Sequence, residues 1–111
     1  MIRADGRVIQ ITQGNTGTIN FTFHDRNGDI LDLYDYDITF MVKKRKVDPD
    51  SKAVITKFYD EIEEPSLAVE LTTTDTAAPV GAYWWSIVLT NGAFKDEAVS
   101  GQFYIIEGVQ D

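Results

Sequence analysis

The sequence predicts an all-β domain in which two sheets pack face to face as a sandwich. Apolar and polar residues alternate with a period of two in four separate segments, as they do in strands that bury one face. Clusters of Gly, Asn, Asp and Pro separate these segments at short intervals and are typical of turns. No segment has the apolar periodicity of an amphipathic helix.

Residues 79–90 are predicted to form the central strand, because they combine a turn at Pro79 and Gly81 with a long run of aromatic and β-branched residues. Side chains alternate between the faces of a strand. We expect one face of this strand to carry Tyr83, Trp85, Ile87 and Leu89. The opposite face would carry Trp84, Ser86, Val88 and Thr90.

Upstream, strands are predicted over residues 7–12, 18–24 and 37–43. The second and third alternate cleanly, with Ile19, Phe21 and Phe23 in one and Ile38, Phe40 and Val42 in the other turned toward the core. Residues 13–17 separate the first of these predicted strands from the second. A polar turn is predicted over residues 25–29, where an Asn-Gly pair tolerates positive φ.

Downstream, residues 44–52 form a predicted charged loop, and residues 53–59 form a strand whose inward face the pattern leaves open. An acidic turn over 60–65 precedes a strand over 67–71, and residues 73–78 suggest a single helical turn. Asn91-Gly92 predicts a hairpin turn after the central strand. The closing strand is predicted over 99–107, with Phe103 and Ile105 facing inward.

A specific cue favours the immunoglobulin-like type of antiparallel sandwich, with about seven strands. In that fold a tyrosine near the start of the sixth strand stands two residues before a buried position, and Tyr83 and Trp85 have this spacing. The length of 111 residues and the absence of repeats predict one domain over 1–111. We expect a mutually buried core of Phe21, Phe40, Tyr83, Trp85, Ile87 and Phe103.

Charge and composition argue against several functions. The net charge of −8 and the pI near 4.4 are opposite to what a phosphate-binding surface needs, so no nucleic-acid partner is expected. The chain has no cysteine for a disulfide, a thiolate metal site or a nucleophile. It shows no signal peptide at its start and no apolar run near the ~20 residues of a membrane span. We therefore expect a soluble chain made in the cytoplasm, with no membrane partner.

Candidate catalytic and metal-binding residues are few. His24, the only histidine, is interpreted as a surface residue at a strand end. The segment beginning at Asp25 starts like a calcium loop, but its twelfth position is Tyr36, where a bidentate glutamate is needed. We expect a polar turn there, no tight calcium site and no cofactor. The nearby carboxylates Asp32, Asp35 and Asp37 fit extra ligands and a solvated acidic edge equally well.

Two further segments could bind anions but have simpler interpretations. Lys43-Lys44-Arg45-Lys46 in so acidic a chain is typical of a solvated strand end that discourages edge pairing. Gly14-Asn15-Thr16-Gly17 lacks the lysine and the strand-to-helix context of a phosphate loop. No catalytic triad can be named, so the sequence predicts a protein that is not an enzyme.

Three motifs follow one another along nearly the whole chain. They are Ile9-Gln10-Ile11-Thr12-Gln13-Gly14-Asn15-Thr16-Gly17, then Phe21-Thr22-Phe23-His24-Asp25-Arg26-Asn27-Gly28-Asp29-Ile30-Leu31-Asp32-Leu33, then Thr73-Thr74-Asp75-Thr76 through Pro79-Val80-Gly81-Ala82-Tyr83. Each is generic for β-sandwiches, but their order and spacing resemble the N-terminal immunoglobulin-like domain of phage baseplate upper proteins. Trp84-Trp85 departs from that family, which often has a second aromatic or a small polar residue there.

The resemblance implies a non-enzymatic structural and assembly module of a phage or prophage tail baseplate that acts by protein–protein docking. Its partners would be other tail or baseplate proteins, with self-association as a further possibility, and its location would be the virion. Because the family's domain heads a longer chain, we expect residues 1–111 to be a fragment or a short stand-alone relative. The alternative is a calcium-dependent or carbohydrate-binding accessory module that uses the Asp-rich stretch 25–37 and the tryptophan pair.

A candidate interface follows if the third, sixth and seventh strands share one sheet, as they do in immunoglobulin-like domains. The outer surface of that sheet would then carry Met41, Trp84, Val88, Tyr104 and Ile106. A contiguous apolar patch with tryptophan and tyrosine at its centre is the usual composition of a protein interface. Cover by a loop or by the N-terminal segment is the competing expectation for this face.

Overall fold

The computed structural model describes residues 7–92 and 94–108, which form two sheets and two short 3-10 helices. In chain order the elements are β1 (Ile9–Thr12), β2 (Gly17–Phe21), β3 (Asp37–Lys43), η1 (Asp50–Lys52), β4 (Ile55–Tyr59), β5 (Leu67–Leu71), η2 (Asp75–Ala77), β6 (Gly81–Asn91) and β7 (Phe94–Ile106). Every strand that the alternation pattern predicts is present, although the ends of several differ. No helix in the described part of the chain is long and apolar enough to cross a membrane.

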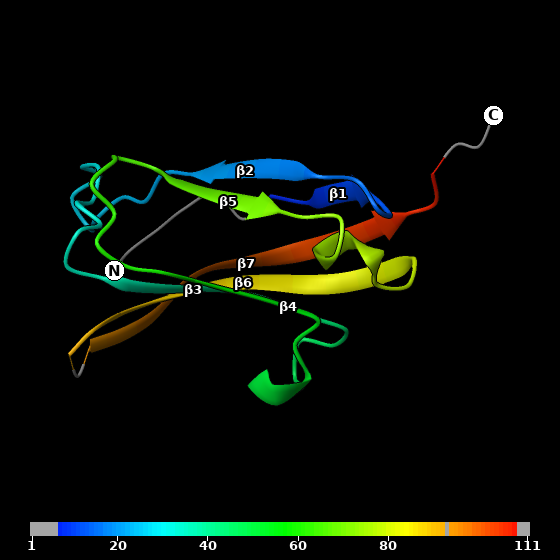
Figure 1. Ribbon diagram of the computed structural model, residues 1–111. Helices are drawn as coiled ribbons and strands as arrows, with labels where there is room; N and C mark the ends of the chain where they lie inside the picture. The colour runs from blue at the N-terminus through cyan, green and yellow to red at the C-terminus, as the bar shows by residue number, and fades with distance from the viewer. Residues whose placement is uncertain (1–6, 93, 109–111) are drawn as a thin grey trace.

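The strands form two layers. A five-stranded sheet has the order β1-β7-β6-β3-β4, and a two-stranded sheet pairs β2 with β5. Figure 1 shows β2 and β5 lying across one face of the larger sheet. The third, sixth and seventh strands share one sheet, as expected, and the all-β immunoglobulin-like sandwich is confirmed.

One pairing departs from the antiparallel expectation. β1 runs parallel to β7, with Ile9 opposite Phe103 and Ile11 opposite Ile105, whereas all other pairs of named strands are antiparallel. Parallel pairing needs a long connection between the two strands, and here nearly the whole chain separates them. The turn after β1 then carries the chain across to β2 in the other sheet.

The core lies between the two sheets, and all six residues expected there are buried: Phe21, Phe40, Tyr83, Trp85, Ile87 and Phe103. Trp85 is its centre, with ring centroids 5.0 Å from Phe21 and 6.2 Å from Phe40. The Trp85 indole N–H donates to the backbone oxygen of Arg7 at 3.0 Å. Gly101 faces Trp85 across the β6–β7 pair, and the missing side chain leaves room for the indole to reach that oxygen.

The tyrosine cue is confirmed at the start of β6. The Tyr83 hydroxyl donates to the backbone oxygen of Pro79, four residues upstream, as in the tyrosine corner of immunoglobulin-like domains. Burial of the ring raises the pKa of the Tyr83 hydroxyl, which keeps it a donor. This bond ties the β5–β6 connection to the core.

The prediction that the closing strand begins at Val99 is wrong, since β7 begins at Phe94. Asn91 and Gly92 do form the predicted hairpin turn, with Gly92 at φ 61°. A β-bulge lies in this hairpin, because Ile87 pairs with Val99 but Val88 pairs with Glu97. A bulge reverses the alternation of side chains along the strand. The period-two pattern of β7 from Val99 onward therefore does not extend back toward Phe94.

Candidate functional site

The outer face of the five-stranded sheet is the face turned away from the core, and β3, β6 and β7 form its centre. Strand register sets the neighbours on this face. Trp84 stands between Lys43 of β3 and Gln102 of β7, and Met41 stands opposite Ser86. Polar residues therefore alternate with the apolar ones across the sheet.

The strand register places four of the five predicted interface residues side by side on this face. Met41, Trp84 and Val88 are half-buried diagonal neighbours on β3 and β6. Tyr104 lies on β7 opposite Ala82, where its hydroxyl donates to Gln102 Oε1 at 2.8 Å. Ile106 pairs with Thr12 of β1 at the far end of the face and is 37% exposed. Tyr104 is also a diagonal neighbour of Trp84, and Ile106 follows it on the same face of β7, so the row of five ends at Ile106.

The β3–β4 loop covers part of this face. Lys46 places its Nζ 5.7 Å from the ring centroid of Trp84 on this face, whereas Lys44 Nζ lies 4.8 Å from the ring centroid of Tyr83, which faces the core. The β3–β4 loop therefore covers the outer face at Trp84, in line with the competing expectation that a loop folds over this face. Residues 1–6, the other expected cover, lie outside the described residues.

Ion pairs hold this loop in place. Lys43 Nζ lies 2.7 Å from Asp50 Oδ1, and Arg45 Nε lies 3.2 Å from Asp48 Oδ1. The hydrogen bond and the charge of Lys43 lower the pKa of the Asp50 carboxyl. The interpretation of Lys43–Lys46 as a solvated strand end agrees with the exposure of Lys44, Arg45 and Lys46 just after β3, and the structure adds contacts of this run with acids and aromatic rings of the same domain.

Two hollows on the outer face form what we call the outer groove. The larger, about 350 Å³, is lined by Thr39, Met41, Lys43, Asp50, Ser86, Val88, Thr90 and Lys95. The smaller, about 120 Å³, is lined by Lys43, Lys46, Trp84, Trp85, Ser86 and Ser100. Lys43 and Ser86 line both hollows, so the two lie next to each other. In Figure 1 the loop carrying η1 and the end of the β6–β7 hairpin both project from this side of the sheet, away from β2 and β5.

The outer groove has the chemistry of a binding surface. Its floor offers the apolar side chains of Met41, Trp84 and Val88, and its rims offer lysine ammonium groups. Asp50 is the only carboxylate among the lining residues, and its lowered pKa makes it a weak base that Lys43 already holds. The arrangement favours an apolar ligand with acidic groups over proton transfer.

The Asp-rich segment is built as the predicted turn. Asp25 Oδ1 accepts the backbone N–H groups of Asn27 at 2.9 Å and Asp29 at 3.1 Å, and Gly28 has φ 88°. His24 forms an isolated bridge with Ile30 at its base. Among residues 7–92 and 94–108, no three histidine or carboxylate side chains are grouped so that they could hold a metal ion.

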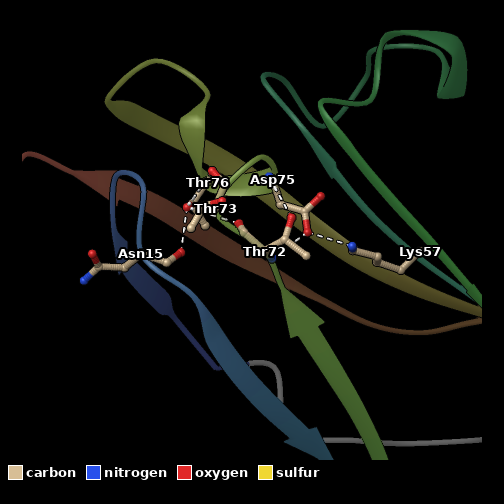
Figure 2. Close-up of polar contacts among 6 residues, drawn as sticks. All are labelled: Asn15, Lys57, Thr72, Thr73, Asp75 and Thr76. Carbon is tan, nitrogen blue, oxygen red and sulfur yellow. Dashed lines mark hydrogen bonds and ion pairs between the residues drawn. The ribbon is translucent and has the colours of Figure 1, made fainter.

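A second polar cluster lies at the end of the sandwich where η2 meets the β1–β2 turn (Figure 2). Thr76, fully buried, donates from its hydroxyl to the backbone oxygen of Asn15 at 2.7 Å. Gly14 N–H donates to the Thr76 oxygen at 3.2 Å, and Gln13 Nε2 donates to the Ala78 oxygen at 3.0 Å. Two of the three motifs described in the sequence thus meet here in a structural role.

Asp75 connects this cluster to the edge strand β4. Its Oδ2 accepts the backbone N–H of Thr72 at 2.8 Å and lies 2.6 Å from Lys57 Nζ (Figure 2). Partial burial raises the pKa of the Asp75 carboxyl, but the hydrogen bonds from Lys57 and Thr72 outweigh burial and lower it below 3.8. Sequence reasoning missed this pair, since 18 positions separate the two residues and no local pattern links them.

We predict that Asp75→Asn lowers the free energy of unfolding at pH 7 by about 1.5–3 kcal/mol, the usual range for hydrogen bonds to a charged group. A carboxyl whose pKa is lower in the folded state stabilises the fold above its unfolded pKa, and this contribution disappears as pH falls through the folded pKa. The difference between the parent and the variant should therefore shrink below about pH 4. Urea denaturation at pH 7, 4 and 3 measures it.

Asp50→Asn is the matched control for that prediction. Its carboxylate also pairs with a lysine and also has a lowered pKa, but its side chain is 71% exposed. Exposed ion pairs contribute little to stability. An equal loss for Asp50→Asn, or a difference for Asp75→Asn that does not depend on pH, would contradict the role assigned to Asp75.

Comparison with known proteins adds no assignment to this geometry, because no protein-family model and no curated protein matches the sequence. The resemblance to the phage baseplate domain stays a prediction. The function must therefore be inferred from the chemistry of the outer groove and from the order of the sequence motifs.

Proposed function

We propose that this chain is a non-enzymatic structural module of a phage or prophage tail baseplate, and that it acts by docking to other tail proteins. The order and spacing of the three motifs support the assignment to a tail. The observation that carries the docking role is the outer groove, where Trp84 and Met41 lie half-buried between two projecting loops. Half-buried aromatic residues in a concave site are typical anchors for a protein partner.

A rigid framework supports this role. Trp85 and its neighbours fill the core beneath the groove, and the pair Lys43–Asp50 holds one of its walls. Docking to a surface that is already ordered costs less conformational entropy than docking to a mobile one. The acidic net charge of −8 would keep free subunits apart before assembly.

Purified particles test the proposal. The chain would be tagged in the bacterium that carries its gene, tail particles would be induced and purified, and gold-labelled antibody would locate the tag by electron microscopy. We expect label at one end of the tail, and particles without that end when the gene is deleted. Complete particles that carry no label and do not need the gene would contradict the proposal; a tagged cytoplasmic protein of similar size is the control for carry-over.

A further inference from the structure

We infer that the outer groove binds an extended, acidic segment of a partner protein, about six residues long. This inference rests on the proposed docking function and assigns the chemistry of the partner. Its observations are the local charge of the groove, the shape of its walls, and its length along β6.

The charge of the groove is opposite to that of the rest of the chain. Lys43, Lys46 and Lys95 line the groove together with one carboxylate, Asp50, in a chain whose net charge is −8. Lys43 is the partner of Asp50, whereas neither Lys46 nor Lys95 forms a salt bridge with another described residue. Lys46 lies over the Trp84 ring and Lys95 contributes to the electrostatic field at Asp50, but neither is held in a salt bridge, so both can meet carboxylates of a ligand. Complementary charge selects partners that bring carboxylates.

The shape and charge of the groove disfavour a second copy of the sheet as its occupant. Asp50 of η1 and Lys95 of the β6–β7 hairpin line the groove, and Figure 1 shows both segments projecting from this side of the sheet, which hinders the approach of a flat sheet to the floor. A symmetric dimer would also place the same patch against itself, so that the lysine-bearing rims of one copy would face the lysine-bearing rims of the other. A narrow segment with negative charge avoids both problems.

The dimensions fit an extended peptide. The lining residues of β6 run from Trp84 to Thr90. At about 3.3 Å per residue this distance is roughly 20 Å, the reach of about six residues in extended conformation. The floor residues Met41, Trp84 and Val88 would contact apolar side chains of the segment, and the rim lysines would bind its carboxylates.

Fluorescence anisotropy with two labelled hexapeptides tests the inference. One probe alternates glutamate with leucine, and the other replaces each glutamate with lysine. We expect the acidic peptide to bind at least about tenfold more tightly than the basic one, and to bind more weakly as salt rises, because charge pairs at the rims are screened. Equal binding of the two peptides, or no binding of the acidic one, would overturn the inference.

Charge-reversal variants locate the site. Lys46→Glu combined with Lys95→Glu should weaken the acidic peptide at least about tenfold, because like charges then face its carboxylates. Arg26→Glu also reverses a charge, on the exposed Asn-Gly turn, although it changes the net charge by half as much as the double variant, and it should alter affinity by no more than about twofold. Equal losses in the two reversals would mean that the whole chain's charge, rather than the groove, controls binding. Circular dichroism would verify that each variant is folded.

Two further measurements decide between occupants. A dimer seen by light scattering that Lys46→Glu with Lys95→Glu dissociates would assign the groove to a second copy and overturn the inference. Binding of oligogalacturonate without binding of the acidic peptide would assign it to an acidic glycan and also overturn it. The particle experiment is independent: labelled tails without peptide binding would remove only the acidic partner, and peptide binding without labelled tails would remove only the assignment to a phage.

Discussion

Replacing Trp85 with alanine is expected to lower the free energy of unfolding by about 3–5 kcal/mol. Trp85 is fully buried between the sheets and packs against Phe21 and Phe40. Its removal would leave a cavity at the centre of the core and would free the backbone oxygen of Arg7 from its hydrogen bond. Domains of this size are commonly stable by only about 5–15 kcal/mol, so the variant should lose a large share of its total stability.

Trp84→Ala is the matched control, since it removes the same side chain from the adjacent position on the opposite face. Trp84 is half-buried and contacts Lys46 of a surface loop rather than the core. We expect a clearly smaller loss, about 1 kcal/mol. Urea denaturation followed by far-ultraviolet circular dichroism measures both variants without depending on tryptophan fluorescence. A larger loss for Trp84→Ala than for Trp85→Ala would contradict the assignment of the two faces.

Gly101→Ala is expected to destabilise the fold by about 1–3 kcal/mol, the usual range for overpacking. A Cβ at this position would lie 2.7 Å from the backbone oxygen of Arg7 and 2.8 Å from Trp85 Nε1. These are the two atoms joined by the indole hydrogen bond, so the added methyl group must displace the backbone at Arg7, just before β1, or the indole. Thermal unfolding of the variant, compared with Ser100→Ala on the outer face, measures the effect.

A double-mutant cycle would identify the cause of that loss. Trp85→Phe removes Nε1 while it keeps an aromatic ring, so part of the contact made by the new methyl group disappears. The cost of Gly101→Ala should therefore be smaller in the Trp85→Phe background than in the parent. Strictly additive losses would show that the indole is not what the methyl group meets.

The sequence alone was sufficient to predict most of the strands and the composition of the core. Period-two alternation reports which face of a strand is buried, and this property belongs to each segment by itself. For that reason the inward positions of Phe21, Phe40 and Trp85 are found without any knowledge of strand order. The Tyr83 corner and the Asn91-Gly92 hairpin are local as well, because their partners lie within a few residues.

The candidate site was predicted only in part, because local alternation assigns a residue to a face of its strand but does not place the loops around that face. Alternation places Met41, Trp84 and Val88 on the outer face, and strand register makes them neighbours. It also places Tyr104 and Ile106 on that face, but neither lines the outer groove. Walls of a groove come from loops, and the positions of loops depend on contacts between distant residues.

What the sequence by itself determined is therefore the all-β class, the inward face of each main strand, and the local turns. Only the tertiary structure decided the features that depend on pairs far apart in the chain: the parallel β1–β7 pairing, the ion pair of Lys57 with Asp75, and the fold of the Lys43–Asp50 loop over the sheet. The β-bulge in the β6–β7 hairpin belongs with them, because it is defined by a register between two strands. Burial follows from local periodicity, whereas charge pairing and register are set by the partner that the folded chain brings near.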